Sequence, residues 1–346
     1  MGLSDIICMA IVVGFLAAVG VSGLRRNNSS ERFFDKTESN ALRGFWCLII
    51  VLVHVPAAYQ NPIQDAIGSF AYIGVTFFFM TSAYGLEASL KKYPERYYGF
   101  WQRRLPKLLV PCFVVNFFDL ALTLAIGQPY IPLSLIRVNN WVIWLLACYT
   151  LWWIAVRAFG SLDAARCIGV IVGVAAISMA GYIFADSSPV GHWPTEVWGF
   201  AWGMLLVRFR DRVFKTTRNR LLVTMISSIA VAFILGVAYL HLKPVPIYGD
   251  YLLKIGLGAS LILIMLESDS IWSFAGRLNS FLGSISYEVY LIHSVVFRVM
   301  SSMLSGRGAS GPFILGCLLI SVLLAYCAHR ISSFLLRSNV SLSAKD

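Results

Sequence analysis

Arg43 and His54 are two basic side chains of different chemistry in one apolar stretch, "ALRGFWCLIIVLVHVPAAY" (residues 41–59). Imidazole exchanges protons near neutral pH, which makes His54 a candidate general base. Guanidinium binds phosphate through paired hydrogen bonds, which makes Arg43 a candidate anion-binding group. In a helix, eleven residues at 100° each bring both side chains to one face, with their backbones roughly 16 Å apart. The spacing predicts a base and an anion site at different depths along one helix.

Other ionisable residues also fall inside apolar stretches. Such groups are costly within a membrane, and they usually pair with one another or face a polar cavity. Asp119 and Arg298 lie at comparable depths, which predicts that they form a pair. A buried histidine such as His54 or His293 can equally serve only to tie neighbouring helices together by a hydrogen bond. Lys254 and Glu288 are the other ionisable residues that fall inside apolar stretches.

The overall composition is that of a membrane protein. Of the 346 residues, 58% are hydrophobic and 13% are charged, and the mean hydropathy is +0.73. About a quarter of the residues of a typical soluble domain are charged. The seven cysteines form no Cys-x-x-Cys pair, which argues against a disulfide framework or a zinc site. We expect no bound metal, because the sequence contains no cluster of residues with metal-ligand spacing.

The apolar stretches predict an all-α, polytopic membrane helix bundle. A bilayer core of about 30 Å needs roughly 20 apolar residues in a helix. We expect the first stretch to be a permanent helix and not a cleaved signal, because no basic residue precedes it. The rule gives eleven spans, at residues 5–24, 42–59, 66–90, 104–126, 140–158, 165–184, 193–208, 221–241, 248–266, 280–304 and 311–334.

The basic residues predict how these spans are oriented. Cytoplasmic loops of membrane proteins carry an excess of Lys and Arg. An N-terminus outside and a C-terminus in the cytoplasm put 23 of the 28 Lys and Arg residues on the cytoplasmic side. The net charge of +11 therefore reflects topology, and we expect no nucleic-acid partner. We interpret the basic run Arg208–Arg220 as cytoplasmic anchoring.

Four motifs, in order along the chain, resemble the acyltransferase 3 family of integral membrane acyltransferases, which O-acylate bacterial surface and secreted glycans. The first is Arg43, ten residues and His54. The second, "GVTFFFMTSAYGL" (74–86), is similar to the Phe-Phe-x-x-Ser-Gly-Tyr stretch of the family, but it has Ala83 where glycine is usual. This departure puts the local helix packing in doubt.

The other two motifs lie further along the chain. "RRLPKLLVP" (103–111) is similar to the basic Arg-x-x-Arg/Lys element of the family, and "LGSISYEVYLIH" (282–293) resembles its Ser-Tyr-x-x-Tyr-Leu-x-His stretch. The resemblance covers roughly residues 38–335, so that a ten-helix acyltransferase core follows one extra N-terminal transmembrane helix within residues 1–30. Residues 336–346 are expected to form a cytoplasmic tail.

The resemblance implies a membrane O-acyltransferase, most simply an O-acetyltransferase of the bacterial inner membrane. Acetyl-CoA or another acyl-CoA would be a co-substrate, with no bound cofactor, and His54 would be the general base. Arg43, at about 16 Å from His54, suits donor binding better than catalysis at the same bond. We expect Arg103, Arg104 and Lys107 to share that role, although simple anchoring at the membrane surface would also explain them.

The acceptor is expected to be a surface polysaccharide or another glycan, and the sequence does not identify the sugar. Direct transfer to the acceptor needs fewer assumptions than an acyl-enzyme on Ser82 or Ser286. The candidate cavity or acceptor residues are Ser82, Tyr84, His192, Glu196, Tyr287 and His293.

Two other functions remain open from the sequence. A transporter of a glycan or lipid-linked precursor would also use many spans with ionisable residues at mid-membrane depth. A degenerate relative with only a structural role is the second alternative, against which the Arg43–His54 pair counts. Some relatives carry an added extracytoplasmic domain, and we expect this chain to act alone or with a separate extracytoplasmic transferase, in contact with membrane lipid.

Overall fold

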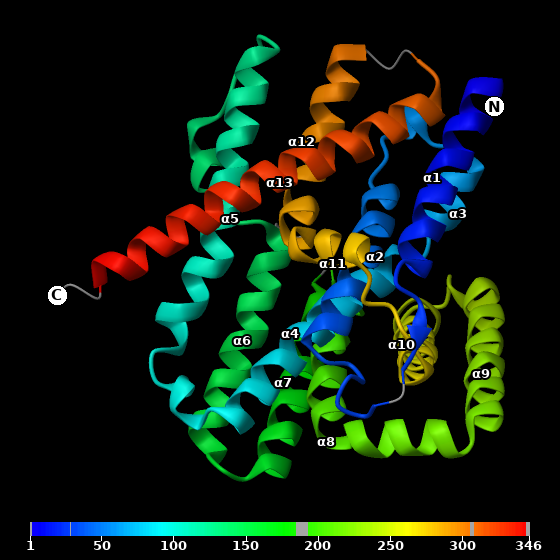
Figure 1. Ribbon diagram of the computed structural model, residues 1–346, viewed down its shortest axis with the longest axis vertical. Helices are drawn as coiled ribbons and strands as arrows, with labels where there is room; N and C mark the ends of the chain where they lie inside the picture. Colours follow the sequence, from blue (N-terminus) through cyan, green and yellow to red (C-terminus); the bar gives the residue numbers. More distant parts are fainter. Residues whose placement is uncertain (1, 28, 185–192, 305–307, 344–346) are drawn as a thin grey trace.

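The computed structural model describes residues 2–27, 29–184, 193–304 and 308–343, and it confirms an all-α membrane bundle (Figure 1). The first half of the chain forms α1 (Leu3–Val21), α2 (Lys36–Val53), α3 (Pro62–Gly68), α4 (Ala71–Lys92), α5 (Phe100–Ala125) and α6 (Asn140–Phe159). The second half forms α7 (Asp163–Ile183), α8 (Trp198–Asn219), α9 (Leu221–Leu242), α10 (Lys254–Ile271), α11 (Arg277–Ser284), α12 (Ser286–Leu304) and α13 (Ser310–Ser343).

Short elements join these helices. The 3₁₀ turns are η1 (Ala57–Tyr59), η2 (Pro94–Tyr97) and η3 (Pro132–Ile136), and a π-helical segment, η5 (Tyr248–Leu253), leads into α10. Two two-residue strands, β1 (Arg25–Arg26) and β2 (Trp272–Ser273), pair antiparallel.

A helix lies at each of the eleven predicted spans, but not all of these helices are long and apolar enough to cross a membrane. Among the described residues, eight meet that standard, or nine if α11 and α12, bent by 69°, count as one span. The two that do not meet it are α2, which begins with the charged residues Lys36 and Glu38, and α8, which continues into basic sequence. The predicted count of eleven is therefore higher than the number of helices that qualify.

Helix α2 ends earlier than predicted. The expected span continued to residue 59, whereas the helix ends at Val53 with His54 as its C-cap. Pro56 explains the difference, because the residue before a proline is disfavoured in the α conformation and proline has no N–H to donate. The side-chain amide of Gln64 caps the end by donating to the carbonyl of Leu52 at 2.5 Å. His54 therefore lies at a helix end instead of inside a continuous span.

Helix α8 is longer than the predicted span of residues 193–208, because it continues to Asn219 through most of the basic run Arg208–Arg220. In Figure 1 it reaches across the lower end of the bundle to α9. The Arg210 guanidinium donates to the carbonyls of Phe33, Ser30 and Glu31, and Arg218 donates to the carbonyl of Asn27 at 2.7 Å. These arginines therefore hold the loop between α1 and α2 in place.

Two helix pairs pack closely where glycine removes the side chain. Gly199 and Gly203 face the backbone of α4, and a Cβ on either would come within 2.3 Å of a carbonyl oxygen there. Small residues at such spacing allow close helix approach in membranes. Ala83, which stands where the family motif has glycine, is fully buried against Gly203. The glycine at this contact therefore lies on α8 and not on α4. Gly44 of α2 allows the same close approach to the backbone of α11.

The first and last helices lie against each other at one side of the bundle. Asp5 of α1 accepts a hydrogen bond from the backbone N–H of Gly311 at the start of α13, at 2.8 Å. Helix α13 then crosses α12 and α5 diagonally (Figure 1). It continues to Ser343, so residues 336–343, expected to be a tail, are helical.

Candidate active site

His54 lines a polar cavity of about 330 Å³, which we call the imidazole cavity. The end of α2 supplies His54, whose side chain is exposed, and α12 supplies His293, which is buried. Helix α5 and the segment before α6 supply the amide and carboxylate groups of the wall. The polar and aromatic lining residues are Cys112, Asn116, Asp119, Arg137, Asn139, Asn140, Trp193, Tyr290 and Ser294. Residues from five parts of the sequence therefore line the cavity around the two imidazoles.

The two imidazole rings face each other across a short distance. Their centroids are 4.9 Å apart and the rings are inclined by 39°. The Nδ1 atom of His293 lies 3.2 Å from the carbonyl oxygen of Val289. A carbonyl can only accept a hydrogen bond, so Nδ1 carries the proton and Nε2 of the neutral ring keeps its lone pair. A proton taken up by His54 thus has a second imidazole beside it as an acceptor.

The predicted pair of Asp119 and Arg298 is present at this cavity. The guanidinium of Arg298 contacts the Asp119 carboxylate and also donates to the hydroxyl of Thr123 at 2.8 Å. Asp119 lines the cavity, and its side chain is 23% exposed. The pair therefore places a fixed, compensated charge in the wall of the imidazole cavity.

Arg43 lies in a second cavity, of about 250 Å³, which we call the Arg43 cavity. Its guanidinium carbon is 5.2 Å from the ring centroid of Phe78, a distance typical of cation–π contact. The Nε atom of Arg43 is buried and has no hydrogen-bond partner among the described residues. Glu288 and His329 also line this cavity and pair with each other at 3.0 Å. The helix thus separates Arg43 from His54 in different cavities, as the spacing predicts.

Tyr287 lies between these two cavities. It lines the Arg43 cavity, donates to the carbonyl of Leu108 at 2.8 Å, and contacts the Cys112 sulfur at 3.3 Å. Cys112 in turn lines the imidazole cavity. The indole of Trp141 packs on Tyr287 and Tyr290, and its buried N–H has no partner among the described residues. Only a thin wall of side chains therefore divides the two cavities.

The third cavity, of about 380 Å³, brings together Arg103, Arg104 and Lys107. We call it the basic cavity. Lys107 also lines the Arg43 cavity, so the four cations expected to bind the donor belong to two adjoining cavities. Tyr97 and Trp152 form aromatic walls of the basic cavity. Burial raises the pKa of Tyr97, against the nearby charge of Arg157, so its hydroxyl stays neutral at physiological pH.

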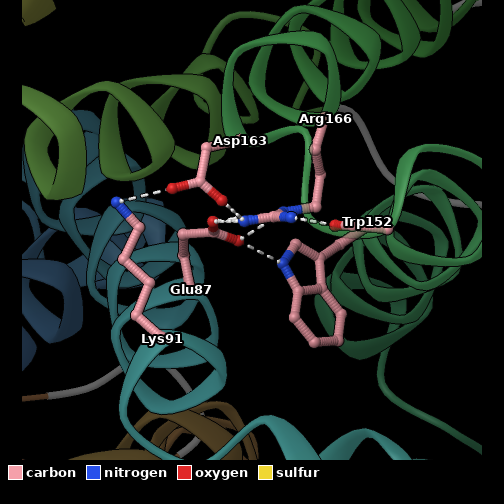
Figure 2. A network of polar contacts seen from close by, with 6 residues as sticks. Glu87, Lys91, Trp152, Asp163 and Arg166 are labelled. Atoms are coloured by element: carbon pink, nitrogen blue, oxygen red, sulfur yellow. Dashed lines mark hydrogen bonds and ion pairs between the residues drawn. The ribbon is translucent and has the colours of Figure 1, made fainter.

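A buried ion pair, drawn in Figure 2, contacts Trp152, which lines the basic cavity. Arg166 donates to both carboxylate oxygens of Glu87, and each side chain is 3% exposed. The indole N–H of Trp152 donates to the same carboxylate at 3.0 Å. Asp163 joins Arg166 at 2.6 Å and Lys91 at 3.4 Å. The network ties α4, α6 and α7 together and holds the Trp152 ring in place.

Three of the predicted acceptor residues lie apart from the imidazole cavity. Ser82 donates to the carbonyl of Phe78 within its own helix, and Tyr84 packs edge-on against Phe34. Glu196 is buried and pairs with Lys254 at 2.7 Å. Of the remaining candidates, His293 lies in the imidazole cavity, Tyr287 lies at its border, and His192 is outside the described residues.

Sequence reasoning missed most of the polar wall of the imidazole cavity. Asn116 lines it, and its amide donates to the carbonyls of Leu135 and Arg137 at 2.9 and 2.8 Å, which holds the segment before α6 against α5. A signal for this existed, because Asn116, Asp119 and Thr123 recur at helical spacing on one face of α5. Asn139 and Asn140 carried no such signal, since they stand at the very start of α6, as its N-cap and its first residue.

Comparison with known proteins gives one match. A family model described as an acyltransferase domain matches residues 36–330 of the chain. Nothing among curated proteins or solved structures matches it. The matched range contains the imidazole and basic cavities and most of the Arg43 cavity, and it excludes α1 and the end of α13.

Proposed function

The chain belongs to the acyltransferase 3 family, and we propose that it transfers an acyl group from acyl-CoA to a hydroxyl of an extracytoplasmic glycan. Membership of the family makes it a membrane acyltransferase. The donor, the acceptor and the residue roles that follow are our proposal. Its main support is the pair of facing imidazoles in a polar cavity, with a separate cationic cavity for a donor.

In the proposed reaction, His54 removes the proton from the attacking glycan hydroxyl. The hydroxyl oxygen forms a bond to the thioester carbonyl carbon, and the carbon–sulfur bond of the donor breaks. The CoA thiolate leaves and takes back the proton from the imidazolium. A positioned base of this kind accelerates such a step by about 10²–10⁴-fold. His293, whose Nε2 carries no proton, can accept a hydrogen bond from the His54 ring and hold it in position.

The donor would be held by the cations of the two adjoining cavities. Guanidinium and ammonium groups suit the phosphates of CoA, so Arg103, Arg104 and Lys107 are proposed to bind them. The thin pantetheine arm would pass Arg43 and Tyr287 to bring the thioester to His54. The oxyanion that forms there needs a hydrogen-bond donor. Asn140 lies in the same cavity and carries amide N–H groups that suit this role.

The proposed topology follows from the charge distribution and takes α2 and α8 to cross the membrane together with the other nine spans. The N-terminus lies outside and the C-terminus in the cytoplasm of a bacterium, so the basic cavity faces cytoplasmic acyl-CoA. The imidazole cavity then opens toward the other side of the inner membrane, where a glycan acceptor is found. Acetyl is the simplest acyl group for this arrangement, and a separate extracytoplasmic transferase is a possible further partner.

The test is the mass of the envelope glycans of the host, in cells with the gene, without it, and with His54→Ala. The proposal predicts acyl-mass increments only with the wild-type gene. Incubation of membranes with acyl-labelled acyl-CoA then identifies the donor. Unchanged glycan masses in all three strains, together with a glycan that accumulates on the cytoplasmic side, would instead indicate the transporter.

A further inference from the structure

A fourth cavity, of about 330 Å³, lies beside the basic cavity, and five of its eight lining residues are aromatic. We call it the aromatic cavity. Tyr97, Trp101 and Trp153 form its flat walls, and Arg157 lies at 5.7 Å from the Trp153 ring. The rings of Tyr97 and Trp153 are nearly parallel, with an interplanar angle of 20° and centroids 6.2 Å apart. The cavity therefore offers stacking surfaces together with one guanidinium.

The aromatic and basic cavities share a wall. Tyr97 and Phe100 line both of them. The hydroxyl of Tyr97 is enclosed and has no hydrogen-bond partner among the described residues. Three cations thus lie on one side of this wall and stacking rings on the other, contributed by the segment from η2 to the first turns of α5 and, for Trp153, by α6. A ligand that fills both cavities must carry a flat ring close to several negative charges.

From this juxtaposition we propose that the aromatic cavity binds the adenine ring of the donor nucleotide, while its phosphates lie in the basic cavity. Every nucleobase has a flat π face that stacks on aromatic side chains and arginine. Each cavity is within the 300–1,000 Å³ usual for small-molecule sites. The inference rests on the proposed acyl-CoA donor and specifies which part of that donor occupies this site.

An interfacial aromatic belt is the simpler explanation for tryptophan and tyrosine at this level of a membrane protein. It accounts for Tyr98, which also lines the aromatic cavity and is 78% exposed. It does not account for the nearly parallel rings of Tyr97 and Trp153, an arginine over one of them, and three further cations beyond a shared wall. Those features suit a ligand that joins a purine to phosphates.

The experiment uses the full-length protein in lipid nanodiscs, and the substitution Trp153→Ala. Equilibrium binding of adenosine 3′,5′-bisphosphate, the nucleotide half of CoA, is measured first. Loss of one stacking ring is expected to weaken this binding by about tenfold. Trp153→Phe keeps a ring and should retain most of the affinity. Trp272→Ala is the matched control, because that indole is 44% exposed and lies on β2, away from these cavities.

A second measurement separates this site from the proposed function. Transfer is assayed with acetyl-CoA and with acetyl-phosphopantetheine, which lacks the adenosine bisphosphate. Trp153→Ala should lower kcat/KM about tenfold for acetyl-CoA and leave the value for acetyl-phosphopantetheine unchanged. Equal losses with both donors, or no loss with either, would overturn the adenine site while the acyltransferase stands. Nucleotide binding that depends on Trp153, without transfer from any acyl-CoA, would uphold the site and overturn the donor's role.

Discussion

The imidazole cavity and the basic cavity differ in how the chain builds them. The basic cavity is mostly local, since Tyr97, Phe100, Arg103, Arg104 and Lys107 lie within eleven consecutive residues. The imidazole cavity is assembled from α2, α5, the start of α6, Trp193 and α12, and its two histidines are 239 positions apart in the sequence. Charge is concentrated in the first cavity, whereas the second combines neutral amides and imidazoles with one compensated pair.

This difference corresponds to two tasks of an acyltransferase. Binding an anionic donor requires positive charge close to the membrane surface, and a short basic segment supplies it. Proton transfer requires geometry held within a few tenths of an ångström, and several packed helices supply that. The comparison therefore predicts that substitutions in the imidazole cavity act on the rate, while those in the basic cavity act on donor affinity and on stability.

The largest effect is expected from His54→Ala. Loss of the proposed general base should reduce kcat for acyl transfer by about 10²–10⁴-fold, with donor affinity nearly unchanged because the cations remain. Labelled acyl transfer and equilibrium binding of CoA measure the two quantities. His241→Ala, an exposed histidine near the end of α9, is the matched control and should be silent. A variant that keeps wild-type kcat would remove the imidazole cavity from the chemistry.

The second largest effect concerns the ion pair behind the basic cavity. Glu87→Gln leaves the Arg166 charge buried without its main partner, which typically costs about 3–5 kcal/mol of stability. Asp163 still contacts Arg166, which places the expected loss toward the lower end of this range. The free energy of unfolding of the purified protein in detergent measures it.

The control for Glu87 comes from the same network. Lys91→Gln breaks the ion pair with Asp163, whose side chains are 40% and 47% exposed, and should change the free energy of unfolding by less than about 1 kcal/mol. Equal losses for the two variants would contradict a buried, structural role for Glu87.

The third effect is on donor binding. Arg43→Gln removes a guanidinium from the path of the proposed donor, and a hydrogen bond to a charged group contributes about 1.5–3 kcal/mol. The KM for acyl-CoA should therefore rise about tenfold to a hundredfold, with a much smaller change in kcat. Steady-state kinetics measure both, and Arg330→Gln, at an exposed position of α13, is the control. A fall in kcat at constant KM would show that Arg43 acts in the chemical step and not in donor binding.

The same contrast explains what the sequence could predict. The basic cluster was predictable because its cations are neighbours on one helix, and the helices themselves followed from hydrophobic length. The end of α2 was misjudged because hydropathy outweighed Pro56. The wall of the imidazole cavity was not predictable in full, because Asn139 and Asn140 reach it only through the packing of α5 against the segment before α6. His293 was found both as an ionisable residue within an apolar stretch and through the family motif.

The smallest effect tests the pair in the wall of the imidazole cavity. Asp119 and Arg298 are in contact, but their side chains are 23% and 42% exposed, so solvent screens the interaction. A double-mutant cycle with Asp119→Asn and Arg298→Gln should give a coupling energy of about 0.2–1 kcal/mol in the free energy of unfolding. If the pair also shapes the cavity, the same cycle measured on kcat should show coupling too, because each residue alters the site through the other. Additive losses in both the free energy of unfolding and kcat would mean that Asp119 lines the cavity independently of Arg298. The imidazole cavity would then contain a carboxylate whose charge is not compensated.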